Sequence, residues 1–135
     1  NNELALLIKT IFTKIINYIN SDKGDYESVI SEKMLDFIHN NYNKDISLLD
    51  FAENLNFSAK YISTLFKKIT GENFKDYLNI YRVKMAKEIL TKKPNIKIKD
   101  LAAMMGCNSV GTFIRIFKKY EGYSPGQYNE INENK

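Results

Sequence analysis

The sequence has few of the residues that build disulfides, metal sites and membrane anchors. It contains one cysteine, Cys107, and one histidine, His39. An internal disulfide is therefore excluded, and we predict no metal site. The most apolar stretch, residues 4–19, is interrupted by Lys9 and Lys14, so it is too polar to span a bilayer, and no signal-peptide pattern precedes it. We expect a soluble, cytoplasmic chain without membrane contact.

The residue patterns of enzymes are also missing. The sequence shows no paired carboxylates, no cysteine–histidine arrangement and no glycine-rich phosphate loop, so we predict neither catalysis nor a cofactor. It shows no strand-like alternation either, whereas apolar spacings of three and four residues recur, which predicts an all-α fold. A chain of 135 residues with 44% apolar content can bury one ordinary core or two very small ones that share an interface. Because the chain begins at Asn1 rather than at methionine, we expect it to be part of a longer protein.

The most informative feature that is present is an internal repeat. Residues 65–77 read LFKKITGENFKDY, and residues 116–128 read IFKKYEGYSPGQY, at a constant offset of 51. Upstream of these, ISLLDFAENLNF (46–57) matches IKIKDLAAMMGC (96–107) at an offset of 50. Each copy predicts a short helix, a sharp turn and a longer helix that ends at a glycine, which together form a helix-turn-helix. A repeat of this kind usually marks one supersecondary unit that is used twice.

Helix start and stop signals organise the rest of the chain. We predict helices over residues 3–20 and 26–43, and a bridging helix from Asn73 to about Thr91, which Pro94 prevents from continuing. Ser124 and Pro125 predict the start of a last short helix. The predicted organisation is a linker or dimerisation helix (1–25), a first helix-turn-helix subdomain (26–72), a bridging helix (73–92) and a second helix-turn-helix subdomain (93–135).

The helix caps and the buried positions can also be predicted. Ser47 and Asp50 suit a capped first short helix, whereas Lys97 leaves the equivalent helix without a side-chain cap. The longer helices are expected to be capped by Ser58 and by Asn108 or Ser109. The predicted buried positions are Val29, Ile30, Met34, Phe37, Ile38 and Tyr42 in the second helix, and Ile62, Leu65, Phe66 and Ile69 matched with Phe113, Ile116, Phe117 and Tyr120 in the two copies.

Positive charge is concentrated on the repeat. Residues 58–119 carry 14 basic side chains against 4 acidic ones, a net charge of +10. Residues 1–57 carry 5 basic against 9 acidic side chains, and residues 120–135 carry 1 against 3. A basic region of this kind is the electrostatic footprint of a protein that binds a polyanion.

The outward faces of the two longer helices have the same layout. Each face is short-chained or polar near the start of the helix and ends in a lysine pair, Lys67–Lys68 or Lys118–Lys119. A helix in the major groove needs small or hydrogen-bonding side chains near base edges and cations near the flanking phosphates. Such lysines also stabilise solvated helix C-termini, but their recurrence in register favours nucleic-acid binding.

Residues 31–129 resemble the DNA-binding domain of AraC/XylS-type bacterial transcription regulators. The stretch DISLLDFAENLNFSAKYISTLFKKITGENFKDYLNIYRVKMAKEIL (45–90) is especially similar to YesN-type response regulators, and GCNSVGTFIRIFKKYEGYSPGQY (106–128) resembles the family signature throughout. The resemblance implies seven helices, two helix-turn-helix units joined by one long helix, and the output domain of a two-component response regulator. It also implies that both recognition helices enter successive major grooves on one DNA face. Two departures are Cys107, where the family usually has an aromatic residue, and Asn129, where it usually has arginine.

The resemblance assigns the base-reading positions. They fall on Lys60, Ser63 and Thr64 in the first unit, and on Val110, Gly111, Thr112, Ile114 and Arg115 in the second. Because Val110, Gly111 and Ile114 offer few hydrogen bonds, we expect the second unit to read thymine methyl groups and groove shape, with Arg115 as its main polar contact. The predicted phosphate contacts are Ser58, Lys67, Lys68, Ser109, Lys118 and Lys119.

Double-stranded DNA is the expected partner, and RNA polymerase is a further one. A homodimer through the N-terminal helix or through an upstream domain is also expected. The apolar stripe of that helix suits a dimer seam, a relay to a sensor or receiver domain, or a packing stub, and two heptads are too few to decide.

Two alternatives remain open at the level of sequence. Successive major grooves lie about 34 Å apart, whereas the bridging helix rises about 25 Å. Either the DNA bends, at a cost of about 1–6 kcal/mol, or only one unit docks fully. The competing function is a helical protein-interaction module whose basic face binds an acidic partner, which predicts no sequence preference among duplexes.

Overall fold

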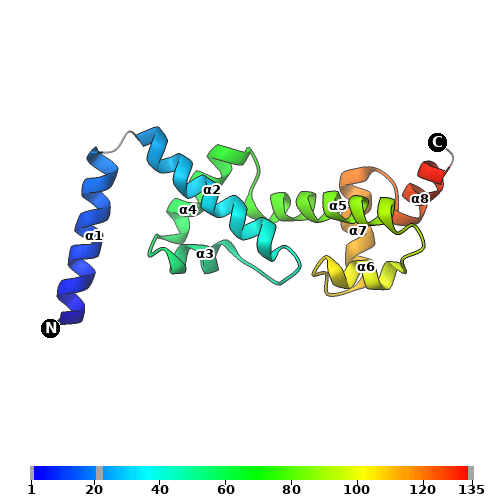
Figure 1. Cartoon of the computed structure of the whole chain (residues 1–135), viewed down its shortest axis with the longest axis horizontal. Coiled ribbons are helices and arrows are strands. Elements are labelled where there is room, and N and C mark those ends of the chain that lie inside the picture. The colour runs from blue at the N-terminus through cyan, green and yellow to red at the C-terminus, as the bar shows by residue number, and fades with distance from the viewer. Residues whose placement is uncertain (1, 21–22, 134–135) are drawn as a thin grey trace.

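The computed structural model describes residues 2–20 and 23–133, and all regular structure in these ranges is helical, as predicted (Figure 1). The helices are α1 (Asn2–Asn20), α2 (Lys23–Asn41), α3 (Leu48–Asn54), α4 (Ala59–Thr70), α5 (Phe74–Lys92), α6 (Ile98–Met104), α7 (Val110–Glu121) and α8 (Pro125–Glu133). The seven helices that the family resemblance implies are α2 to α8. None of the helices described here combines the length and the apolar character that crossing a membrane requires.

Helix α5 is the spine of an elongated molecule, with α1 at one end and α8 at the other (Figure 1). It contributes Leu78 to one hydrophobic core and Val83, Ala86 and Leu90 to a second. The first core adds Ile30, Met34 and Ile38 from α2, Phe51 and Ala52 from α3, and Ile62, Leu65 and Phe66 from α4. The second core adds Leu101, Ala102, Met105, Phe113, Ile116 and Phe117. Each core therefore holds one helix-turn-helix unit against a different half of α5.

The sequence repeat is also a structural repeat. Helices α3 and α6 have seven residues each at an offset of 50, and α4 and α7 have twelve residues each at an offset of 51. The sharp turns predicted within the two units contain Asn56 (φ 58°) and Gly106 (φ 73°) in the left-handed region, which both residue types tolerate. Gly71 and Gly122 end α4 and α7 in the same conformation.

The helix caps follow the sequence predictions. Ser47 and Asp50 form a reciprocal capping box at the start of α3, whereas Lys97 makes no side-chain cap for α6. Ser58 caps α4, and Ser109, rather than Asn108, caps α7. Since a side-chain cap contributes about 0.5–2 kcal/mol, the first unit has the better-defined helix start.

Two predicted core residues are exposed. Val29 is 53% exposed, because the buried line of α2 runs through Ile30, Met34 and Ile38, about 100° further round the helix. Ile69 is 39% exposed, because it lies in the last turn of α4, beyond the buried part of that helix. The predictions for these two side chains were wrong, at Val29 because it faces away from the core and at Ile69 because α4 runs past the core there.

Candidate nucleic-acid interface

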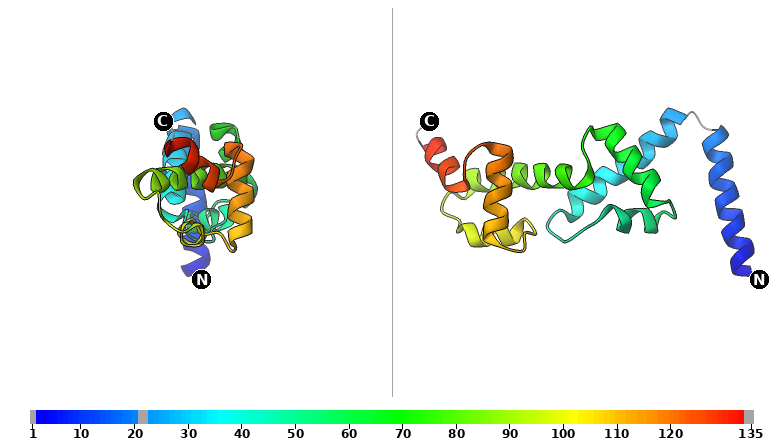
Figure 2. Two further views of the ribbon diagram at one scale, coloured as in Figure 1. Left: turned by 90° about the vertical axis from the view of Figure 1, so that its right-hand side faces the viewer. Right: turned by 180° about the vertical axis from the view of Figure 1, so that it is seen from behind.

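Helices α4 and α7 lie on the same side of the molecule. In the view from behind in Figure 2, both lie on the side that faces the viewer, α7 upright and α4 inclined, beside different halves of α5. Each packs its buried stripe inward, Ile62, Leu65 and Phe66 in α4, and Phe113, Ile116 and Phe117 in α7. Their opposite faces are therefore presented to solvent on one side.

The outward face of α4 consists of residues that the sequence analysis selected. Lys60, Ser63, Thr64 and Lys67 are all exposed, and their spacing of three and four residues places them along one side of the helix. Ser58, just before the helix, is also exposed, and its hydroxyl accepts a hydrogen bond from the Tyr61 amide at 3.1 Å. The exposure that a DNA contact requires is present, while the contacts themselves stay predictions.

Helix α7 repeats this layout with less polar side chains. Gly111, Ile114, Arg115 and Lys118 are exposed, and a Cβ atom built on Gly111 would meet no other atom within 4 Å. This open surface allows a base edge to approach the backbone closely. Val110 is half-buried against the second core.

Thr112 and Ser109 are mainly occupied with each other. The Ser109 hydroxyl donates to the Thr112 hydroxyl at 2.8 Å and accepts from the Thr112 amide at 3.1 Å. Thr112 is also half-buried. A DNA contact by either side chain would compete with this helix cap, so these two are weaker candidates than Arg115 and Lys118.

The two lysines of each pair point in different directions. Lys67 and Lys118 follow Thr64 and Arg115 by three residues, on the outward faces. Lys68 instead forms a salt bridge with Glu27 of α2, with its ammonium nitrogen 3.0 Å from the carboxylate. We infer that Lys68 has less charge available for a phosphate than Lys67.

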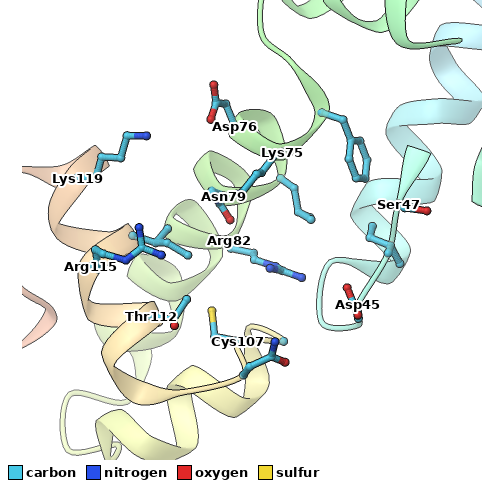
Figure 3. A pocket seen from close by; sticks show the side chains of 16 residues that line it. Asp45, Ser47, Lys75, Asp76, Asn79, Arg82, Cys107, Thr112, Arg115 and Lys119 are labelled. Carbon is cyan, nitrogen blue, oxygen red and sulfur yellow. The ribbon is translucent and has the colours of Figure 1, made fainter. Parts of the chain in front are cut away.

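A cleft of about 530 Å³ separates the two units on the side of α7 (Figure 3). Thr112, Arg115 and Lys119 of α7 face Lys75, Asn79 and Arg82 of α5, with Asp45 and Ser47 from the loop before α3 at its other end. Lys75 and Asn79 are not among the site residues predicted from the sequence. The available signal was that both are polar and, with Arg82, recur at spacings of four and three residues along one face of the helix.

Hydrogen bonds and burial set the electrostatics of this cleft. The Tyr120 hydroxyl donates to Asp76 at 3.1 Å, and burial, together with this bond, raises the pKa of Tyr120. Burial raises the pKa of Cys107, an effect that the nearby Arg82 opposes. The half-buried Cys107 packs against the second core, consistent with a small apolar filler in place of the usual aromatic residue. In residues 2–20 and 23–133, no three metal-binding side chains are grouped.

Comparison with known proteins places this geometry in a family. A model described as "Helix-turn-helix domain" matches residues 51–131. The chain is 35% identical over 101 residues to the uncharacterized HTH-type transcriptional regulator YtdP of Bacillus subtilis. The aligned region covers 75% of this chain and 13% of that protein. The chain is 30% identical to the melibiose operon regulatory protein of Escherichia coli, covering 75% of this chain and 33% of that protein. The chain thus spans well under half of these two curated relatives.

Solved structures agree in fold and sequence. The C-terminal domain of AraT, a response regulator from Geobacillus stearothermophilus, matches with a TM-score of 0.72 and 30% identity, over 76% of this chain and 84% of that one. The C-terminal domain of the two-component response regulator yesN from Fusobacterium nucleatum matches with a TM-score of 0.67 and 34% identity, over 73% of this chain and 95% of that one. With two helix-turn-helix units on one spine and matches to bacterial regulators throughout, the chain belongs to the AraC-type family of helix-turn-helix domains.

Proposed function

We propose that this chain is a sequence-specific, double-stranded DNA-binding domain of a bacterial transcription regulator, with α4 and α7 in successive major grooves. The observation that carries the proposal is the pair of matched, exposed faces on one side of the molecule. The net charge of +10 over residues 58–119 supports it, because neutralising phosphates supplies much of the affinity for DNA. This function requires a cytoplasmic location, where the bacterial chromosome lies.

The contacts divide between bases and backbone. We assign base contacts to Lys60, Ser63, Thr64, Val110, Gly111, Thr112, Ile114 and Arg115, and phosphate contacts to Ser58, Lys67, Lys68, Ser109, Lys118 and Lys119. To the second set we add Lys75, which is exposed at the cleft between the two units. Because phosphate contacts position a domain while base contacts specify the sequence, only the first set is expected to change base preference.

The similarity to the AraT and yesN domains supports the finer proposal that this is a response-regulator output domain. The two cores on α5 likewise support dividing the chain into subdomains 26–72 and 93–135 with a bridge at 73–92. An upstream receiver or sensor would then control when the domain binds DNA.

Substitutions on the readout faces test the DNA-binding proposal. On a duplex selected from a random pool, Thr64→Ala and Arg115→Ala are each expected to weaken binding by about 1–3 kcal/mol, or about 5- to 150-fold, and to relax base preference. The matched control is Lys84→Ala, because Lys84 is exposed and lies about 180° round α5 from Lys75, away from the cleft. Titration against the selected duplex and a scrambled one measures both effects. Equal affinity of the unmodified chain for the two duplexes would favour the protein-interaction module instead.

The homodimer is a further proposal, and helix α1 supports it. Leu4, Leu7, Ile8, Ile11 and Ile15 are each at least half exposed, and a second copy of α1 offers the same apolar surface for a two-fold interface. We therefore expect the chain to dimerise and a chain that lacks residues 1–22 to be monomeric, which sedimentation equilibrium measures. A monomer in both cases would leave α1 as a relay or a packing stub. RNA polymerase stays a predicted partner to which no residue is assigned.

A further inference from the structure

Arg82 lies where α5 passes from one core to the other. Its neighbours along the helix are Leu78, which belongs to the first core, and Val83, which belongs to the second. The guanidinium reaches out of α5 to the loop between α2 and α3. Its Nε donates to the Tyr42 carbonyl at 2.8 Å, and one terminal nitrogen donates to the Lys44 carbonyl, also at 2.8 Å. Arg82 therefore fastens this loop of the first unit to the spine.

The turn of the second unit meets the same loop directly. A Cβ atom built on Gly106 would lie 2.8 Å from the Asn43 carbonyl carbon, 2.9 Å from the Asn43 oxygen and 3.1 Å from an Arg82 nitrogen. No side chain fits there, and the φ of +73° independently favours glycine. The nearest atoms belong to the Asn43 backbone, so no flexible side chain could move aside to make room for a Cβ atom at position 106. Tyr42, in the same loop region, packs against both cores and so also connects the two units.

This junction precedes a recognition helix. The turn at Gly106 leads within four residues into α7, whereas Asn43 belongs to the loop that leads into α3 and α4. A second tie is the hydrogen bond from Tyr120 of α7 to Asp76 of α5. The separation and the rotation between α4 and α7 therefore depend on α5 together with these contacts.

We propose that Arg82, acting with Gly106, is a positioning residue that sets the number of base pairs between the two half-sites read by α4 and α7. The inference rests on the proposed DNA-binding function. One added base pair moves a half-site by about 3.4 Å along the duplex and rotates it by about 34–36°. A rigid junction cannot follow this displacement, whereas a loosened one can.

The test is a series of duplexes with the selected half-sites one or two base pairs closer or further apart. For the unmodified chain, a one-base-pair change is expected to weaken binding about tenfold or more. Arg82→Lys and Arg82→Gln should reduce this penalty to about threefold or less, because neither side chain presents the fork of donors that holds both carbonyls. Gly106→Ala should have the same effect from the other side of the junction. Lys84→Gln, on the far side of α5, should leave the spacing profile unchanged.

The possible outcomes separate the two proposals. Folded Arg82 and Gly106 variants that keep the steep spacing profile of the unmodified chain would overturn the inference while leaving DNA binding intact. Loss of the helical circular dichroism signal in all three variants would also overturn it, because a positioning role requires that both units fold without the junction. An unmodified chain that does not distinguish the selected duplex from a scrambled one would instead overturn the proposed function.

Discussion

Raising the salt concentration from about 50 to about 200 mM is expected to weaken DNA binding by the chain about a hundredfold. Four lysines end the recognition helices, Lys67 and Lys68 in α4, and Lys118 and Lys119 in α7. Each phosphate that such a cation neutralises releases counterions and contributes a slope of about −0.9 to the plot of log affinity against log salt. Lys67, Lys118, Lys119 and Lys75 give about four such contacts, because Lys68 already pairs with Glu27, and four contacts give a slope of about −3.6. Fluorescence anisotropy titrations at several salt concentrations measure it.

Single lysine variants test which lysines contribute to this salt slope. Lys67→Ala and Lys118→Ala should each make the slope shallower by about 1 and weaken all duplexes to a similar extent. Lys68→Ala should have a smaller effect, because Glu27 already pairs with Lys68. Lys84→Ala, at a distance from the proposed interface, is the control. If the slope does not respond to Lys67→Ala or Lys118→Ala, the phosphate contacts have been placed on the wrong surface.

Truncating Phe117 is expected to cost about 3–5 kcal/mol of stability. Its side chain is fully buried, and its ring lies 5.9 Å from those of Phe113 and Tyr128, measured between ring centroids. A domain of this size has a total stability of about 5–15 kcal/mol, so Phe117→Ala should unfold the second unit at markedly lower urea concentration. Phe66→Ala is the equivalent change in the first core, where Phe66 is 1% exposed.

Because each core holds one unit, the two phenylalanine variants are expected to lose protection from hydrogen exchange in different helices. In Phe117→Ala, amide hydrogen exchange should accelerate most in α6, α7 and α8, whereas in Phe66→Ala it should accelerate most in α2, α3 and α4. Ile114→Ala, on the outward face of α7 where the side chain is 36% exposed, should cost only about 1 kcal/mol of stability. Uniform acceleration along the whole chain in both phenylalanine variants would show that the two units unfold as one.

Much of the fold could be predicted because its signals are local. Helix spacing, the serine caps and the glycine stops depend on residues within one or two turns of each other, and α4 and α7 end at Gly71 and Gly122, both in the left-handed conformation. The repeat then predicted two similar units, and the exposed faces of α4 and α7 follow once the buried stripes are known. The same local reasoning failed at Val29, where the buried face of α2 lies about 100° further round, and at Ile69, where α4 extends beyond the first core.

The junction between the units could not be predicted in this way. Arg82 hydrogen-bonds to carbonyl groups 38 and 40 residues earlier in the chain, and no local pattern encodes that distance. The cleft residues Lys75 and Asn79 were missed for a different reason, because their polar spacing with Arg82 along one face of α5 was local but was not used. Asn129, which departs from the family pattern, donates to the Pro94 carbonyl at 3.0 Å and so ties α8 to the loop after α5. Helix α1 is held similarly, because Lys14 donates to the Leu55 carbonyl and lies 4.8 Å from the centre of the Phe57 ring.

Interference by guanine methylation, combined with interference by uracil in place of thymine, on a duplex selected from a random pool tests most directly whether both helices read DNA together, since the two report guanine and thymine-methyl contacts in the major groove. Two clusters of interfering bases on one face of the duplex, centred about 10–10.5 base pairs apart, are the expected result. A single cluster, or two clusters offset by half a helical turn, would contradict the simultaneous docking of α4 and α7.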